Sequence, residues 1–172
     1  MTELRRLLIG VDRLRLINSD DDYITLNPNE SHYLKRVLRL KIGQEVEVVD
    51  SCGNLWTACL QSGENIKLNT PFNMPIKSEP KPYPLIGLGV AVPRRGFDEV
   101  LRMSCELGID FLQPLLSDRS SPQVVDRSSR WGSIIREASE QSERLWKPKL
   151  LDLVNASRWW STPSENSAFA IA

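Results

Sequence analysis

The first seventy residues place hydrophobic and polar side chains in short alternating runs, the pattern of strands that bury one face. A turn around Gly53 separates two of these runs, as expected of a hairpin. The predicted strands are Arg5 to Ile9, Glu45 to Val49, Leu55 to Leu60 and Ile66 to Asn69. Several short strands with one helix predict a small β-barrel over residues 1–70.

The helix of this region is predicted between Asn27 and Leu40. Asn27 can cap it, Pro28 suits its first turn, and Glu30 stands three residues after the cap. Its apolar face comprises Leu34, Val37 and Leu38, and its basic face comprises Lys35, Arg36, Arg39 and Lys41. Such a basic face can follow an RNA backbone, but an ordinary solvated helix face has the same composition, so both interpretations stay open.

The pattern changes after residue 70. Residues 71–84 contain five prolines, which remove backbone donors and fix φ, so we expect a semi-rigid linker without regular structure. Residues 85–92 form a nearly continuous apolar run, typical of a strand buried on both faces. Helical spacing begins at Phe97 and ends at Gly108, and a second apolar strand covers Ile109 to Leu116. This order predicts a parallel βαβ unit, and residues 85–172 are expected to belong to an α/β domain.

The remainder of this domain continues the alternation. A polar loop is expected from Ser117 to Ser129, a second helix from Arg130 to Leu145, and a strand from Lys149 to Leu153. The run from Ala168 to Ala172 predicts a further strand, in which the chain stops. An α/β domain that ends on an apolar strand indicates a shortened chain, either a fragment or a truncated gene product.

Composition narrows the function classes. The 172 residues contain 22 Lys and Arg against 22 Asp and Glu, and the sequence pI of about 6.6 means that a nucleic-acid footprint has to be local. The three cysteines form no CxxC pair and there is one histidine, so we expect reduced thiols and no metal site. The chain shows neither a signal peptide nor a membrane span, and we expect a cytoplasmic protein.

Candidate chemistry lies after the predicted parallel strands. Arg94 and Arg95 follow the first strand and Arg119 follows the second, where ligands bind in open parallel sheets. Their guanidinium groups can hold a phosphate or an enolate oxygen, although surface loops are often charged without such a role. Glu140 and Arg144 are an i, i+4 pair at the end of the second helix, which points away from that edge in a simple βαβ path, so catalysis there needs another topology or a second subunit.

Several strings resemble one known family. H-Y-L-K-R-V-L-R from His32 to Arg39, followed by Gly43, is similar to the barrel signature of the RsmE family of ribosomal RNA methyltransferases. The strings that resemble its α/β domain are P-R-R-G at 93–96, E-L-G at 106–108, S-D-R-S at 117–120, and the R-W, E-A-S-E-Q-S and R residues between 130 and 144. Their order and spacing match over about residues 5–151, nearly the whole chain.

The resemblance implies a fold and an activity. The expected fold is a PUA-like RNA-binding barrel followed by an incomplete SPOUT domain with a trefoil knot, in a homodimeric enzyme. The implied reaction is the methylation of N3 of a uridine in 16S ribosomal RNA of the small ribosomal subunit, with S-adenosylmethionine as methyl donor. It implies catalytic roles for Arg94, Arg119, Glu140 and Arg144, with Glu140 as proton acceptor, and RNA contacts for Arg6, His32, Arg36, Arg39 and Arg95.

Two departures and two alternatives accompany this resemblance. The family usually carries lysine where Arg94 stands, in a loop that is one residue longer. Its glycine-rich cofactor motifs are expected beyond Ala172, so the cofactor-binding residues are unknown and this chain should bind the methyl donor poorly. One alternative is an RNA-binding module without catalytic activity. The other is an unrelated α/β protein whose arginine-lined edge binds a phosphorylated metabolite.

Overall fold

The computed structural model describes residues 5–16, 22–62, 64–120, 124–159 and 168–171. The chain divides into two compact units, Met1–Lys81 and Pro82–Ala172. Each unit has its own hydrophobic core.

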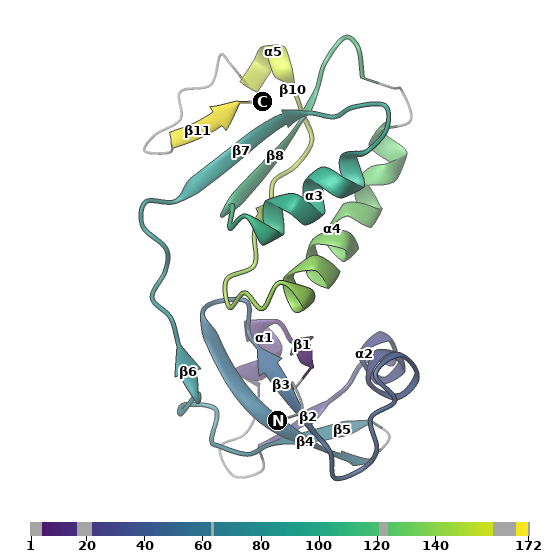
Figure 1. Ribbon diagram of the computed structural model, residues 1–172, viewed down its shortest axis with the longest axis vertical. Helices are drawn as coiled ribbons and strands as arrows, with labels where there is room; N and C mark the ends of the chain where they lie inside the picture. Colours follow the sequence, from purple (N-terminus) through teal and green to yellow (C-terminus); the bar gives the residue numbers. More distant parts are fainter. Residues whose placement is uncertain (1–4, 17–21, 63, 121–123, 160–167, 172) are drawn as a thin grey trace. The chain divides into compact units, whose positions relative to one another are not determined.

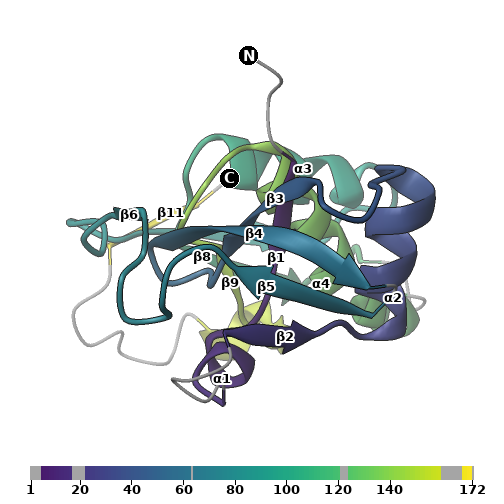
Figure 2. The same cartoon turned by 90° about the horizontal axis from the view of Figure 1, so that it is seen from below.

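Unit 1 is built on a six-stranded sheet. The strands are β1 (Arg6–Leu8), β2 (Tyr23–Thr25), β3 (Glu45–Val49), β4 (Asn54–Ser62), β5 (Asn65–Leu68) and β6 (Lys77–Ser78). Their order is β1-β3-β4-β5-β2, with β6 also paired to β4, and Figure 2 shows β4 between β3 and β5. The β1 and β3 strands are parallel, and the other pairs are antiparallel. Among the described residues no rung joins β1 to β2, so closure of this sheet into the predicted barrel stays a prediction.

The predicted linker contributes to unit 1. Lys77 pairs with Leu55 across β6 and β4, and Phe72 stacks on the buried Trp56 with ring centroids 5.4 Å apart. The Trp56 Nε1–H also donates to the Phe72 carbonyl at 3.2 Å. The expectation that residues 71–84 hold no regular structure is therefore wrong, because the prolines leave the Lys77–Ser78 backbone free to pair.

The helix of unit 1 begins as predicted but ends differently. Helix α2 (Pro28–His32) starts with a capping box, in which Glu30 N–H donates to Asn27 Oδ1 and Asn27 N–H donates to Glu30 Oε2, each at 2.9 Å. It continues as a π-helical turn, η1 (Tyr33–Val37), rather than running to Leu40 as an α-helix. A short helix, α1 (Val11–Leu14), precedes it and was not predicted.

The wider turn changes which side chains are buried. Leu34 is fully buried, but Val37 is 60% exposed, so the predicted apolar face does not include Val37. The Leu38 N–H donates to the Tyr33 carbonyl, five residues back, which is the π-helical spacing. The chain then leaves the helix through Arg39, whose φ of 54° is left-handed.

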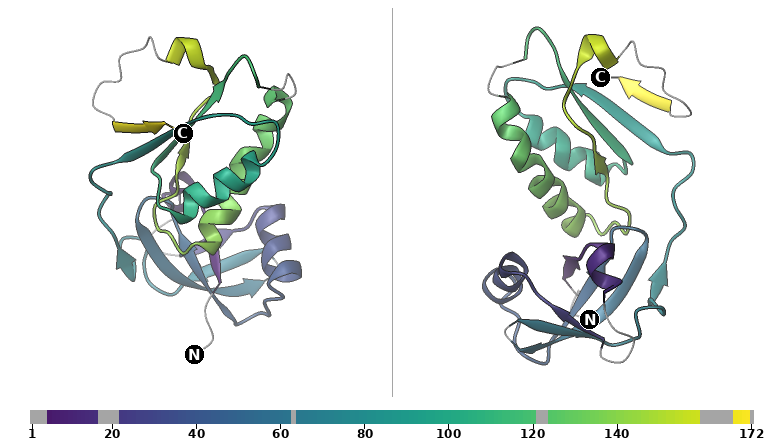
Figure 3. Two further views of the ribbon diagram at one scale, coloured as in Figure 1. Left: turned by 45° about the horizontal axis from the view of Figure 1, so that its top comes forward. Right: turned by 180° about the vertical axis from the view of Figure 1, so that it is seen from behind.

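Unit 2 is a parallel α/β layer. Its elements are β7 (Ile86–Ala91), α3 (Phe97–Glu106), β8 (Phe111–Leu116), α4 (Val124–Gln141), β9 (Lys149–Leu150), β10 (Val154–Asn155), α5 (Ala156–Trp159) and β11 (Ala168–Ile171). The sheet order is β10-β8-β7-β11, with β9 also paired to β8, and every described pair is parallel. Helices α3 and α4 lie side by side on one face of this sheet (Figure 1), and β11 lies beside β7 (Figure 3).

The predicted βαβ unit is confirmed, and α3 ends at Leu107 and Gly108, whose φ is 86°. Helix α4 begins at Val124, six residues before the expected start at Arg130, so the predicted loop to Ser129 is too long. Residues 126–129 are polar, so the first turns of α4 show no apolar periodicity, but the backbone bonds of a helix do not require one.

The third strand is interrupted opposite a proline. Strands β9 and β10 both pair with β8, but the residues between them bulge where Pro114 stands in β8. Proline has no N–H for the ladder, and the buried Gln113 supplies a donor instead, through its Nε2, to the Asp152 carbonyl at 2.6 Å. The predicted strand from Lys149 to Leu153 is thereby divided in two.

Candidate functional site

The carboxyl ends of the parallel strands meet at one edge of unit 2. The sheet runs outward from β7 to β8 and β10, then crosses back so that β11 pairs with the other side of β7. This reversal of direction is a topological switch point, and open parallel sheets bind ligands beyond the carboxyl ends of the strands that flank it, here β7 and β11. The loops after β7 and β8 therefore border the position where a ligand is expected.

The loop after β7 carries two of the predicted arginines. Arg94 and Arg95 are both exposed, and they stand between the end of β7 and the start of α3. Gly96 follows with a φ of 83° and accepts the first helical bonds, from Glu99 N–H and Val100 N–H. A residue with a side chain would be strained at this φ, so the glycine allows the helix to start directly behind the arginines.

The third arginine stands on a tight turn after β8. Ser117 to Ser120 form a turn closed by a bond from Ser120 N–H to the Ser117 carbonyl at 2.9 Å, with the exposed Arg119 inside it. The Ser120 hydroxyl donates to the Val92 carbonyl at 3.2 Å, just beyond β7. This bond ties the turn of Arg119 to the loop that continues to Arg94.

The charge at this edge is not neutralised by ion pairs in the part of the chain that the structure describes. Asp98, in the first turn of α3, pairs with Arg130 at 3.0 Å. No described carboxylate pairs with Arg94, Arg95 or Arg119. Exposed guanidinium groups in such a position can make bidentate contacts with phosphate or with a delocalised oxyanion.

Glu140 and Arg144 lie away from this edge within one chain. Arg144 donates through Nη1 to the Cys105 carbonyl at 3.2 Å and to the Ile109 carbonyl at 3.3 Å, at the end of α3 and before β8 begins. Glu140 has a side chain only 9% exposed and accepts from Arg136 at 3.5 Å. The structure therefore does not bring these two residues together with Arg94 and Arg119 in a single copy of unit 2.

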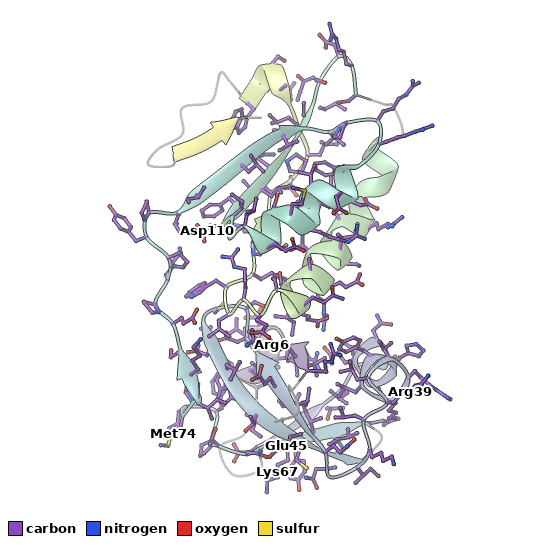
Figure 4. The ribbon with its side chains drawn as sticks, in the orientation of Figure 1. Arg6, Arg39, Glu45, Lys67, Met74 and Asp110 are labelled. Atoms are coloured by element: carbon purple, nitrogen blue, oxygen red, sulfur yellow. The ribbon has the colours of Figure 1, made fainter. Side chains whose placement is uncertain are left out.

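The RNA-contact residues predicted in unit 1 fall into two groups. His32, Arg36 and Arg39 are exposed on one continuous segment, and Figure 4 shows Arg39 pointing away from the strands of its unit. Arg6 differs, because its side chain is 12% exposed and its Nε donates to Glu47 Oε2 at 2.6 Å across β1 and β3. The structure thus gives Arg6 a partner within the sheet.

The segment from His32 to Ile42, called the basic segment, exposes the cations that the sequence predicted on one helix face. Lys35, Arg36, Arg39 and Lys41 are all exposed, and none of them forms an ion pair among residues whose positions are described. Two apolar side chains, Val37 and Ile42, are 60% and 71% exposed between these cations. Free cations of this density suit a polyanion rather than a neutral partner.

One buried thiol has a shifted pKa. Burial raises the pKa of Cys105, and its contact with the Ser139 hydroxyl at 3.8 Å and the charge of Arg144 oppose that rise. A thiol that stays protonated in a core is a poor nucleophile. The described residues contain no group of His, Cys, Asp and Glu that could hold a metal ion, and no helix there is long and apolar enough to cross a membrane.

Comparison with known families accounts for both units. Residues 79–172 match the model of an RNA methyltransferase domain, which is more than half of the chain. The chain belongs to this RNA methyltransferase family. Residues 26–69 match the PUA domain of RNA methyltransferases, so the family member carries both domains in the order that its motifs predicted.

A curated relative supports the same assignment. The chain is 39% identical over 128 residues to the ribosomal RNA small subunit methyltransferase E of Synechocystis sp.. The aligned region covers 73% of this chain and 41% of that protein, so the chain spans about two-fifths of the length of this relative. The resemblance to the RsmE family is confirmed.

Solved structures share the fold. The ribosomal RNA small subunit methyltransferase E of Neisseria gonorrhoeae, bound to S-adenosyl methionine, matches 94% of this chain and 67% of its own with a TM-score of 0.72 at 22% identity. A putative methyltransferase from Legionella pneumophila, also in complex with SAM, matches 95% of this chain and 68% of its own with a TM-score of 0.77 at 18% identity. At these identities the likeness concerns the fold.

The sequence interpretation missed the part played by Ser120. The S-D-R-S string was noted for its arginine, whereas the structure shows the second serine joining two loops. Serine at the first and fourth positions of a turn is a usable signal. The partner of its hydroxyl, in another strand, could not be found without the fold.

Proposed function

We propose that the protein methylates N3 of a uridine in 16S ribosomal RNA of the small subunit, with S-adenosylmethionine as methyl donor. The observation that carries this proposal is the family assignment of unit 2 together with three arginines at the carboxyl edge of its sheet that form no ion pair with any described residue. The relative named as a small subunit methyltransferase and the neighbours bound to the methyl donor support it.

The chemistry explains why arginines suit this edge. Uridine N3 carries a proton, and its removal spreads negative charge over O2 and O4. Arginine stays protonated, so Arg94 and Arg119 cannot accept that proton. Their fixed positive charge can stabilise the anion as it forms. Arg95, beside them, is then placed to hold a backbone phosphate of the same RNA.

The proton acceptor requires a second copy of the chain. Glu140 and Arg144 lie at the other end of unit 2 from Arg94 and Arg119 in one chain. A role for Glu140 as acceptor, and for Arg144 beside it, therefore goes with a homodimer in which a second copy completes the site. The same arrangement suits the trefoil-knotted SPOUT fold, whose members act as dimers.

The cofactor is proposed to bind at the switch point of the sheet. The order β10-β8-β7-β11 contains the strand reversal at which α/β proteins hold nucleotide-like ligands, and this supports the position. The bound cofactor would supply an activated methyl group, and the loop of Arg94 would help to hold the acceptor base in line with it.

Unit 1 is proposed to hold the RNA. Its PUA-like fold, expected to close as a barrel, presents His32, Arg36 and Arg39 on one exposed segment. Such contacts position an RNA through its phosphates without reading its sequence. The reaction is expected in the cytoplasm, where ribosomal RNA is available.

Methyl transfer from labelled S-adenosylmethionine to 16S RNA tests the proposal. Methylated N3 blocks base pairing, so reverse transcription should stop at the modified uridine. Arg119→Ala should lower the rate by about a hundredfold, as loss of one charge-stabilising group does. Arg102→Ala is the matched control, because Arg102 lies on α3 and pairs with Glu99 at 3.4 Å.

Two results would contradict this proposal. RNA binding without any methyl transfer, in a sample that titration calorimetry shows to be saturated with methyl donor, would leave an RNA-binding module. Tight binding of a phosphorylated metabolite without RNA binding would favour the alternative of an unrelated α/β protein whose arginine-lined edge binds such a metabolite. Light scattering of the same sample tests the homodimer.

A further inference from the structure

The ladder between β7 and β8 is interrupted at its last rung. The Val92 N–H donates to the Leu115 carbonyl at 2.9 Å, as a parallel pair requires. The next rung of that ladder would be a bond from Ser117 N–H to the Val92 carbonyl. Instead, Ser117 N–H donates to the Ser120 hydroxyl at 3.1 Å, and the Ser120 hydroxyl donates to the Val92 carbonyl at 3.2 Å.

The hydroxyl of Ser120 is used to its full capacity in this arrangement. A serine hydroxyl has one proton to donate and two lone pairs to accept with. Ser120 donates to Val92, accepts from Ser117 N–H, and lies 3.2 Å from the Ser117 hydroxyl. Because its proton goes to Val92, the Ser117 hydroxyl is the donor in that last contact.

The hydroxyl is not needed to close the turn itself. The turn already has its own backbone bond, from Ser120 N–H to the Ser117 carbonyl at 2.9 Å. The hydroxyl adds a connection to Val92, the residue that follows β7, 28 positions earlier in the chain. It holds the two strands one hydroxyl group apart at the edge where the arginine loops begin.

We propose that Ser120 is a positioning residue, whose hydroxyl sets the place of Arg119 relative to the loop of Arg94. This inference rests on the proposed function, and it adds that Arg119, which stabilises the uridine anion there, also contacts the RNA in the bound state. Without the hydroxyl, Ser117 N–H and the Val92 carbonyl either bond directly or take up water. Direct bonding draws the turn toward β7 and moves Arg119 with it, whereas a water leaves the turn held by a molecule that exchanges with solvent, so that Arg119 is less firmly placed.

Binding of 16S RNA by the full chain, measured over a range of salt concentrations, tests the proposal. Arg119→Ala should weaken binding about tenfold, as loss of a charged hydrogen bond does. Ser120→Ala should weaken it to a similar extent, and Ser120→Thr, which keeps the hydroxyl, should restore it. Ser133→Ala is the matched control, since Ser133 is exposed on α4.

The double substitution separates positioning from folding. If Ser120 acts through Arg119, then Ser120→Ala should cause no further loss in the Arg119→Ala protein. An equal loss in both backgrounds would show that Ser120 supports the fold only, and would overturn the inference. So would Ser120→Ala binding as the unchanged protein does while Arg119→Ala is weakened. If Arg119→Ala itself binds normally, the proposed arginine site fails, and this inference fails with it.

Hydrogen exchange on the unchanged protein tests whether the Ser120 contact is formed, without the changes in folding that a substitution can cause. The Ser117 N–H should be protected to an extent similar to the Val92 N–H, because both take part in the ladder of β7 and β8. Rapid exchange at Ser117 beside a protected Val92 would mean that the Ser120 rung is not formed, and would overturn the inference.

Discussion

Replacing Arg39 by glycine should stabilise unit 1 and weaken RNA binding at the same time. Arg39 adopts a φ of 54° directly after Leu38, the C-cap of η1, at the position where helices usually place glycine. A left-handed conformation costs an L-residue about 1–2 kcal/mol. Glycine gives back about 0.5–1 kcal/mol of this through its larger loss of chain entropy. The expected net gain is therefore about 0.5–1 kcal/mol, and an arginine kept here despite that cost points to a use for its charge.

Arg39→Ala is the matched control for this change. Both variants lose the guanidinium group, but only glycine relieves the backbone. Hydrogen exchange of the buried β3 and β4 strands in urea reports the stability of unit 1. The RNA-binding constant, measured over a range of salt concentrations, reports the lost charge. In both variants the slope of its logarithm against the logarithm of the salt concentration should fall by about one phosphate contact. If Arg39→Gly is no more stable than Arg39→Ala, the left-handed residue is not strained and the reasoning is wrong.

Four further outcomes are expected. Arg144→Ala should lower the free energy of unfolding by about 1.5–3 kcal/mol in urea denaturation, since two carbonyls lose a charged donor; a loss of methyl transfer at unchanged stability would contradict this structural role. Gln113→Leu should speed the hydrogen exchange of the backbone amides around Asp152, because the 2.6 Å bond from Gln113 to the Asp152 carbonyl is removed. Unchanged exchange would refute the role of that bond. Iodoacetamide should label the exposed Cys52 before Cys105, as mass spectrometry can show. Because burial raises the pKa of Cys105 in the fold, the unfolded thiol ionises first, so stability should fall as pH rises above about 8.5, the ordinary thiol value, and a Cys105→Ser protein should lack that fall.

Local patterns were sufficient for several elements. The capping box at Asn27 and Glu30 was predictable because its two bonds join residues three apart. The continuous apolar runs at β7 and β8 indicated two parallel strands, and Gly108 marked the end of α3. These features depend on neighbours in the chain, so the sequence contains all the information that they need.

Other elements depended on distant partners. The two-residue strand β6 forms because it pairs with β4, and no pattern in the proline-rich segment predicts that pairing. The π-helical turn at Tyr33 to Val37 and the left-handed Arg39 were equally hidden, since a periodicity cannot distinguish five-residue from four-residue bonds over one turn.

The arginine-bearing turns separate the two sources of information most clearly. By itself, the sequence determined which loops carry Arg94 and Arg119, and that both follow parallel strands, because strand order and charge are properties of the chain. Only the tertiary structure decided that Arg144 caps the end of α3 and that the Ser120 hydroxyl bridges to Val92. Both contacts join residues more than 25 positions apart, and such contacts arise from how the strands and helices pack, which no local pattern records.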